Sequence, residues 1–327
     1  MLANALYFHN KNNMQTNWKI RKKSLAFVTL SSYLLVSNWA QTGGLEQLFM
    51  QLLDSVLYTF LGILGAIFAN LSGAGGGVVF IPVFNSLGLS EAQAISTSFT
   101  IQCFGMTAGA MTWCLHYLNA TQAKSASAEI PEQQDIWRPF LPVVALTSLC
   151  SIAGIYSAYA GDFTPPGSLP KLFSIFSIAL GASLLLQLFL ARRASAKNAP
   201  VTDTGLKTYD YLCLALIGYF GGMITACLSV GVGELLVFYL LIRGFNIQLS
   251  LACAIVVTAL SVWSAVFTLA GLTDSWLTYD PLWQLALYAG PGAVIGGLVA
   301  KSLVAKIPPL RLKFLLALLI LFMGFAG

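Results

Sequence analysis

Long apolar runs separated by short polar segments dominate this chain. After a first run that follows a basic cluster near residue 20, further runs cover about 56–88, 92–118, 138–161, 170–191, 211–244, 249–271, 282–303 and 309–327. Six of these later runs have the length of roughly 20 residues that a membrane-spanning helix requires. The pattern therefore predicts an all-α, polytopic membrane protein.

Composition points to the same class. Of the 327 residues, 57% are hydrophobic and 9% are charged, whereas roughly a quarter of a soluble domain is charged. A soluble protein must present a polar exterior to water, and a lipid environment removes that requirement. The 17 basic residues lie in short clusters without interleaved aromatics, so nucleic acid is not an expected partner. We expect a multi-pass protein of the cell (inner) membrane.

Residues 1–40 have the layout of a targeting segment. Four basic residues between Lys19 and Lys23 precede an apolar run over 24–40. This arrangement is typical of either a signal peptide or an uncleaved first helix. In both cases the basic flank stays in the cytoplasm, and the segment after it begins outside.

Two of the apolar runs are too long for a single span, and glycine interrupts both. The first interruption is Ser72-Gly73-Ala74-Gly75-Gly76-Gly77, and the second is Ser229-Val230-Gly231-Val232-Gly233. Glycine at this density is unfavourable in a helix interior. We therefore expect non-helical backbone at these two places, which we call the first and second breaks.

Basic clusters set the expected topology. Arg192, Arg193, Lys197 and Lys207 mark 192–208 as cytoplasmic, and a second cluster marks 301–313 likewise. These positions agree only if each broken run is a re-entrant hairpin that enters the membrane and returns. The hairpins place 272–281 outside and 119–137 in the cytoplasm. The chain then divides into the first membrane repeat (41–191), a linker (192–208) and the second repeat (209–327).

An internal repeat relates the two halves at an offset of 156 positions. Matching pairs are Asp54/Asp210, Gly62/Gly218, Gly65/Gly221, Gly75/Gly231, Gly77/Gly233 and Gly88/Gly244. Each half is predicted to contain one broken hairpin followed by three spanning helices. Because three is odd, the halves would be inverted relative to each other, a plan that transporters use to hold substrate between broken helices.

The breaks are candidate anion sites. The short segments after them, 78–88 and 234–244, reach about half the hydrocarbon thickness, so each would begin near the bilayer centre. A helix N-terminus offers unpaired N–H groups and about half a positive charge. Close helix packing is the alternative reason for these glycines. The expected substrate-binding residues are Ser72, Gly73, Gly75, Gly76, Gly77, Thr97, Ser98, Ser229, Gly231 and Gly233.

Glu234 is the acidic residue that this topology places deep in the membrane. An intramembrane carboxyl is costly and is therefore a functional candidate. It is either a proton-coupling group or a structural helix cap. Capping is also the expected role of Asp54 and Asp210, and His116 beside Trp113 fits an interfacial aromatic belt. The six cysteines lie in apolar runs without C-x-x-C spacing, which predicts free thiols and neither a metal site nor a cofactor.

One stretch resembles a known family. The segment from Gly65 through the first break, followed by Pro82 and by Ala94-Ile95-Ser96-Thr97-Ser98, is similar to the first repeat of the TauE/SafE family. The resemblance covers about 56–327. It implies export of sulfite, sulfoacetate or another organosulfonate, with a small anion as partner. The second break departs from the pattern, because it lacks the triple glycine and is followed by Glu234.

Two other functions compete with a proton-linked anion exporter. An anion channel stays possible from the residues alone, because selectivity filters also use backbone dipoles. An intramembrane enzyme is less favoured, because the sequence has no His/Cys/Asp cluster, no G-x-S-x-G with partners and no H-E-x-x-H. We therefore expect a transporter, with no prediction of its oligomeric state.

Overall fold

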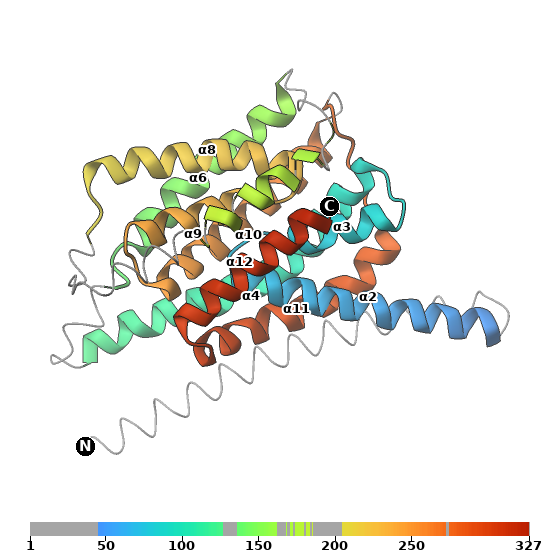
Figure 1. Cartoon of the computed structure of the whole chain (residues 1–327), viewed down its shortest axis with the longest axis horizontal. Coiled ribbons are helices and arrows are strands. Elements are labelled where there is room, and N and C mark those ends of the chain that lie inside the picture. Colours follow the sequence, from blue (N-terminus) through green and yellow to red (C-terminus); the bar gives the residue numbers. More distant parts are fainter. Residues whose placement is uncertain are drawn as a thin grey trace, which may run out of the picture.

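A computed structural model describes residues 45–126, 136–161, 205–272 and 275–326, with scattered positions between 168 and 185. The expectations for 1–40, for 127–135 and for most of the 192–208 linker fall outside these residues. Every regular element within the described part is a helix, which confirms the all-α class (Figure 1). The helices are α2 (Leu45–Ser72), α3 (Gly77–Ser86), α4 (Glu91–Ala126), α6 (Phe140–Ala160), α8 (Thr208–Leu228), α9 (Val232–Ile242), α10 (Ile247–Gly271), α11 (Trp283–Lys306) and α12 (Pro309–Ala326).

Five of the described helices are long and apolar enough to cross a membrane: α2 from Asp54 onward, α6, α8, α10 and α11. Their outward side chains include large apolar groups such as Phe60, Leu149 and Phe267, which are 57%, 68% and 68% exposed. Such side chains are suited to lipid rather than to water. α4, which covers the predicted 92–118 run, is not among the five, and its residues 96–102 include four hydroxyl side chains and a glutamine. The chain is a multi-pass membrane protein.

Long helices from opposite halves pack against each other. α2 lies along α11, and α8 lies along α6, as Figure 1 shows for both pairs. Glycines allow the close approach, because a Cβ on Gly62 would lie 2.0 Å from the Ala289 carbonyl oxygen. On the other side, a Cβ on Gly218 would lie 2.7 Å from the Thr147 carbonyl oxygen. Each half therefore supplies a long helix that packs on the other half's first helix.

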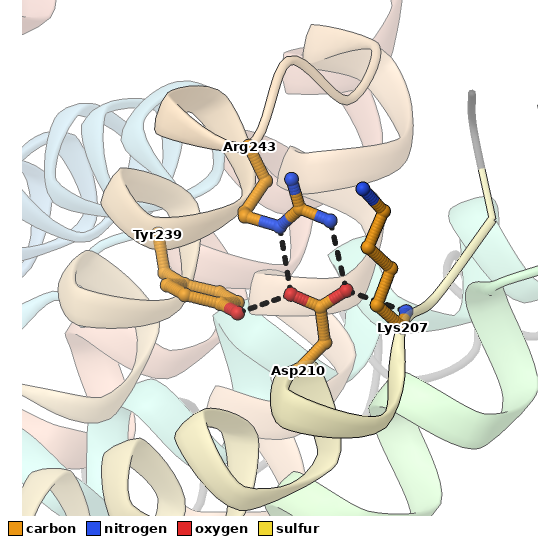
Figure 2. Close-up of polar contacts among 4 residues, drawn as sticks. All are labelled: Lys207, Asp210, Tyr239 and Arg243. Atoms are coloured by element: carbon orange, nitrogen blue, oxygen red, sulfur yellow. Dashed lines mark hydrogen bonds and ion pairs between the residues drawn. The ribbon is translucent and has the colours of Figure 1, made fainter. Parts of the chain in front are cut away.

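Two helix pairs turn back on themselves. α2 ends at Ser72 and α3 begins at Gly77, and the Phe80 ring packs against Gly65 of α2. α8 ends at Leu228 and α9 begins at Val232. Asp210 near the start of α8 binds Arg243 immediately after α9 (Figure 2). α9 therefore returns toward the end of the bundle at which α8 starts.

The two short helices finish in the same way. Gly88 and Gly244 have positive φ angles of 77° and 85°. After α3, the Leu89 N–H donates to the Phe84 carbonyl, and after α9 the Phe245 N–H donates to the Leu240 carbonyl. This pattern is a glycine-dependent helix C-cap, in which a left-handed residue satisfies the last carbonyls. Both caps obey the offset of 156, so the sequence repeat extends to backbone conformation. The inverted orientation of the halves in a bilayer stays a prediction.

The two aspartates of the repeat have different surroundings. Asp210 acts as expected for a cap, because its Oδ2 accepts the Lys207 N–H at 2.7 Å. Asp54 does not, because α2 begins at Leu45 and Asp54 lies exposed within the helix. The expectation of a capping role for Asp54 was wrong, since helical structure extends beyond the apolar run that suggested the boundary.

Candidate functional site

The two breaks lie against each other in the centre of the described bundle. A Cβ on Gly77 would lie 2.5 Å from the Ser229 carbonyl oxygen, and a Cβ on Gly233 would lie 2.1 Å from the Gly73 carbonyl oxygen. Under the offset of 156, Gly73 corresponds to Ser229 and Gly77 to Gly233. Each break therefore presents the same carbonyl to the same glycine of the other, the reciprocity that a local two-fold axis produces.

The backbone at each break is in a conformation that ends the preceding helix. Gly73 and Ser229 have φ angles of 70° and 59°, both in the left-handed region. Ser229 is the C-cap of α8, and its N–H donates to the Thr225 carbonyl at 2.8 Å. Among described residues other than glycine, Ser229 is the one with a positive φ, a conformation that costs an L-residue roughly 1–2 kcal/mol.

Gln102 of α4 joins the two breaks. Its Oε1 accepts the Gly76 N–H at 2.7 Å, so it occupies the N-terminus of α3. Its Nε2 donates to Ser229 Oγ at 2.7 Å and to Ser98 Oγ at 2.9 Å. Ser98 Oγ and Ser229 Oγ are 2.9 Å apart. All three side chains are buried, so a closed polar network lies within the apolar core.

The second break is arranged differently. Glu234 Oε2 accepts the Gly231 N–H at 2.7 Å at the start of α9. The Val232 N–H donates to Thr225 Oγ1 at 3.0 Å. The side chain of Glu234 is 4% exposed, and its Oε1 accepts no hydrogen bond within the described part of the chain. Thr258 holds the position that corresponds to Gln102, and its buried hydroxyl likewise has no partner there.

Two of the predicted site residues have other partners. Thr97 Oγ1 accepts the Leu282 N–H at 2.8 Å, so its hydroxyl is used at the start of α11. Successive helical side chains point about 100° apart, which turns Thr97 away while Ser98 reaches the breaks. Ser72 Oγ donates to the Phe68 carbonyl at 2.7 Å and accepts the Ala74 N–H at 3.1 Å. Its contacts are local to the end of α2.

The consecutive glycines of the first break are all in close contact. A Cβ on Gly75 would lie 2.8 Å from Gln102 Oε1, and one on Gly76 would lie 2.7 Å from the Phe80 ring. Because the chain changes direction here, neighbouring glycines face different parts of the protein. Packing thus accounts for a consecutive block as well as for spaced pairs, and anion binding by these glycines stays a proposal.

Gln102 is the residue that the sequence analysis missed. One sequence signal was available, because Gln102 follows Ser98 by one helical turn in a largely apolar segment. Its partners Gly76 and Ser229 lie 26 and 127 positions away along the chain. Those contacts depend on how α4 crosses both breaks.

His116 lies in an aromatic cluster at the other end of α4 from the break-facing residues. Its ring centroid is 5.3 Å from that of Trp137 and 6.0 Å from that of Trp113. Lys301 Nζ lies 5.5 Å from the Trp113 ring centroid. These contacts fit the aromatic-belt interpretation of His116.

The chemistry of the site is that of backbone N–H groups, neutral polar side chains and one carboxyl group, that of Glu234. All six cysteines are free. The described residues contain no group of three or more His, Cys, Asp or Glu side chains placed to hold a metal ion. The N-termini of α3 and α9 meet here, each with an oxygen acceptor supplied by the chain itself, from Gln102 and Glu234 respectively.

Comparison with known proteins identifies the family. A model of the family described as Sulfite exporter TauE/SafE matches residues 58–326. No curated protein and no solved structure matches the chain. The match covers both breaks and the helices around them, so the resemblance in the first repeat extends to nearly the whole described fold. The chain belongs to the TauE/SafE family of sulfite exporters.

Proposed function

We propose that this protein exports a small oxyanion such as sulfite, sulfoacetate or another organosulfonate across the cell (inner) membrane. Family membership supports a membrane transporter of sulfite or related anions. One observation carries the choice of site: the N-termini of α3 and α9 meet where the two breaks touch. Each terminus contributes about half a positive charge and backbone N–H donors beside this contact.

The neighbouring side chains suit an oxyanion. Gln102 Nε2 and the hydroxyls of Ser98 and Ser229 are donors within one hydrogen-bonded network. A sulfonate or sulfite presents three oxygens, which neutral donors can bind without the desolvation cost of a buried lysine or arginine. The substrate would replace bonds that these donors now make to one another.

The closed contact between the breaks supports a carrier rather than an open channel. Gly77 lies against the Ser229 carbonyl, and Gly233 lies against the Gly73 carbonyl. A substrate can enter only if the two hairpins separate. Separation toward one side at a time is alternating access, which broken-helix transporters achieve by moving one repeat against the other.

Glu234 is the proposed proton-coupling residue. Its carboxylate lies at the N-terminus of α9, on the same N–H group that an anion would use. An ionised carboxylate opposes a second anion, and protonation removes that opposition. Proton and substrate would then bind together and cross together.

The test is transport by the purified protein in liposomes. Vesicles loaded with sulfite, sulfoacetate or chloride are diluted into buffer with labelled sulfoacetate. A carrier for these anions shows saturable uptake that is faster in vesicles preloaded with unlabelled substrate. The reason is that the binding site returns to the outer side with substrate bound, which is faster than its return when empty. Uptake that rises linearly with concentration and ignores preloading indicates a channel. The proposal fails if labelled sulfoacetate, and labelled sulfite tested in the same way, enter no faster than into protein-free vesicles.

A further inference from the structure

The two helix N-termini at the breaks are both occupied by side-chain oxygens of the protein itself. At α3 the occupant is the neutral amide oxygen of Gln102, 2.7 Å from the Gly76 nitrogen. At α9 it is the carboxylate of Glu234, 2.7 Å from the Gly231 nitrogen. The two occupants differ in charge, although the breaks are related by the repeat.

A purely structural cap explains this carboxylate poorly. The position in the first repeat that corresponds to Glu234 is Val78, the second residue of α3. α3 forms without an acidic side chain in its first turn. At α3 a neutral amide oxygen, that of Gln102, accepts from the N-terminal N–H, so this position needs an acceptor but not a negative charge. The cap uses Oε2, while Oε1 is buried without a hydrogen bond of normal geometry, and the carboxyl group also lies beside the N–H groups of Gly75 and of Glu234 itself. A buried, unsatisfied carboxylate oxygen is costly, so its retention calls for another role.

We infer that the Glu234 carboxylate is a tethered anion that occupies half of the substrate site, and that the substrate oxyanion binds by displacing it. The inference rests on the proposed function. The N–H of Gly231 that now donates to Oε2 is the donor that the substrate takes over. Gln102 and Ser229 supply the other half of the site with neutral donors.

Charge sets the strength of this competition. Two negative groups about 4 Å apart, at an effective dielectric of about 20, repel by an amount equivalent to roughly a thousandfold in affinity. Movement of the side chain relieves part of the repulsion, so we expect the measured competition to be at least about tenfold. In the empty transporter the carboxylate also keeps the helix N-terminus satisfied, which stabilises the closed contact between the breaks.

The experiment measures binding of sulfoacetate, and separately of sulfite, to the purified full chain by titration calorimetry at pH 7.5. Glu234→Gln keeps the size of the side chain and removes the charge, and is expected to bind at least tenfold more tightly than wild type. Glu91→Gln is the matched control, because Glu91 is an exposed acidic residue in the first turn of α4. Its affinity should equal that of wild type.

A second variant keeps the test informative if Glu234→Gln fails to fold, judged by size-exclusion chromatography. Glu234→Ala opens the position, so added acetate should compete with sulfoacetate in this variant and have little effect on wild type. The tethered anion is overturned if wild type binds and Glu234→Gln binds equally or more weakly. It is also overturned if wild type binds and acetate does not compete in Glu234→Ala. Either result leaves the proposed function standing. Absence of binding by every folded form overturns the proposed function itself.

Discussion

The Asp210 carboxylate and the Arg243 guanidinium form a two-point ion pair that joins the start of α8 to the residue after α9. Arg243 Nε lies 2.7 Å from Oδ1, and its terminal nitrogen lies 2.9 Å from Oδ2 (Figure 2). The Tyr239 hydroxyl donates to Oδ1 as well. Asp210 is completely buried, while Arg243 is 21% exposed. The start of α8 and the end of α9, which lie away from the second break, are therefore joined by a bidentate, charge-assisted contact.

At the corresponding described positions, the first hairpin has no counterpart of this pair. The residue that corresponds to Arg243 is Leu87, which is 51% exposed, and Asp54 is exposed on α2. Two hairpins related by a repeat thus differ in how firmly their ends are joined. We expect the α2–α3 hairpin to move more than the α8–α9 hairpin during transport.

Asp210→Asn should destabilise the protein by about 2 kcal/mol. Removal of one partner of a buried ion pair costs several kcal/mol, and the partial exposure of Arg243 reduces this cost. The change in stability is measured by thermal unfolding in detergent, with the reaction of the buried cysteines with a thiol-specific dye as the readout. Asp54→Asn is the matched control and should stay within about 0.5 kcal/mol of wild type. Equal shifts for the two variants would remove the proposed difference between the hairpins.

Gln102→Met should greatly reduce sulfoacetate transport while the protein stays folded. Methionine has a similar shape but cannot accept from Gly76 or donate to Ser98 and Ser229. Loss of a buried polar partner costs about 1–3 kcal/mol, or up to roughly a hundredfold in apparent affinity. Uptake into proteoliposomes measures this effect, with exposed Gln248→Met as the control. Unchanged uptake by Gln102→Met would exclude the network as a substrate site.

Gly233→Ala should impair folding of the core. The added methyl would lie 2.1 Å from the Gly73 carbonyl oxygen, and backbone on both sides leaves little room for adjustment. Gly271→Ala is the control, because a Cβ there meets nothing within 4 Å. The monodisperse yield after size-exclusion chromatography should fall only for Gly233→Ala. A normal yield and unfolding temperature for that variant would show that the contact between the breaks is loose.

Binding of sulfoacetate, whose charge is nearly constant in this range, should strengthen for wild type as pH falls from 8 to 5. Protonation of Glu234 removes the negative charge that opposes the substrate, so the proton and the anion bind together. Because Glu234→Gln lacks this titratable carboxyl, it should bind sulfoacetate with little dependence on pH. Calorimetric titrations across this range compare the two proteins. Parallel curves would assign the coupling to another residue.

The loop that contains Ser195 should face the cytoplasm. A single cysteine introduced there, in a background without the native cysteines, should react with an impermeant maleimide only after the cells are opened. The basic residues of 192–208 favour this side. A cysteine at Thr278 should react in intact cells, since 272–281 is expected outside. Labelling of Ser195→Cys in sealed cells contradicts the re-entrant hairpins.

Local features of the sequence determined the class of the protein and the places where its two broken runs are interrupted. Apolar runs of spanning length identified a membrane protein, because apolar side chains can face lipid tails but are unfavourable in contact with water. The density of glycine at 72–77 and 229–233 marked the places where α2 and α8 end, because glycine is a poor helix former and populates positive φ. The offset of 156 identified the repeat that the caps at Gly88 and Gly244 share.

Tertiary structure alone decided which of these features meet. Gln102 contacts a serine 127 positions away, and Asp210 contacts an arginine 33 positions away, and neither pairing has a local signal. Thr97 and Ser98 are neighbours in sequence, yet only Ser98 reaches the breaks, because one step along a helix turns a side chain by about 100°. Helix limits follow from local backbone preference and hydrophobicity, whereas contacts between distant side chains depend on how every helix packs against the others.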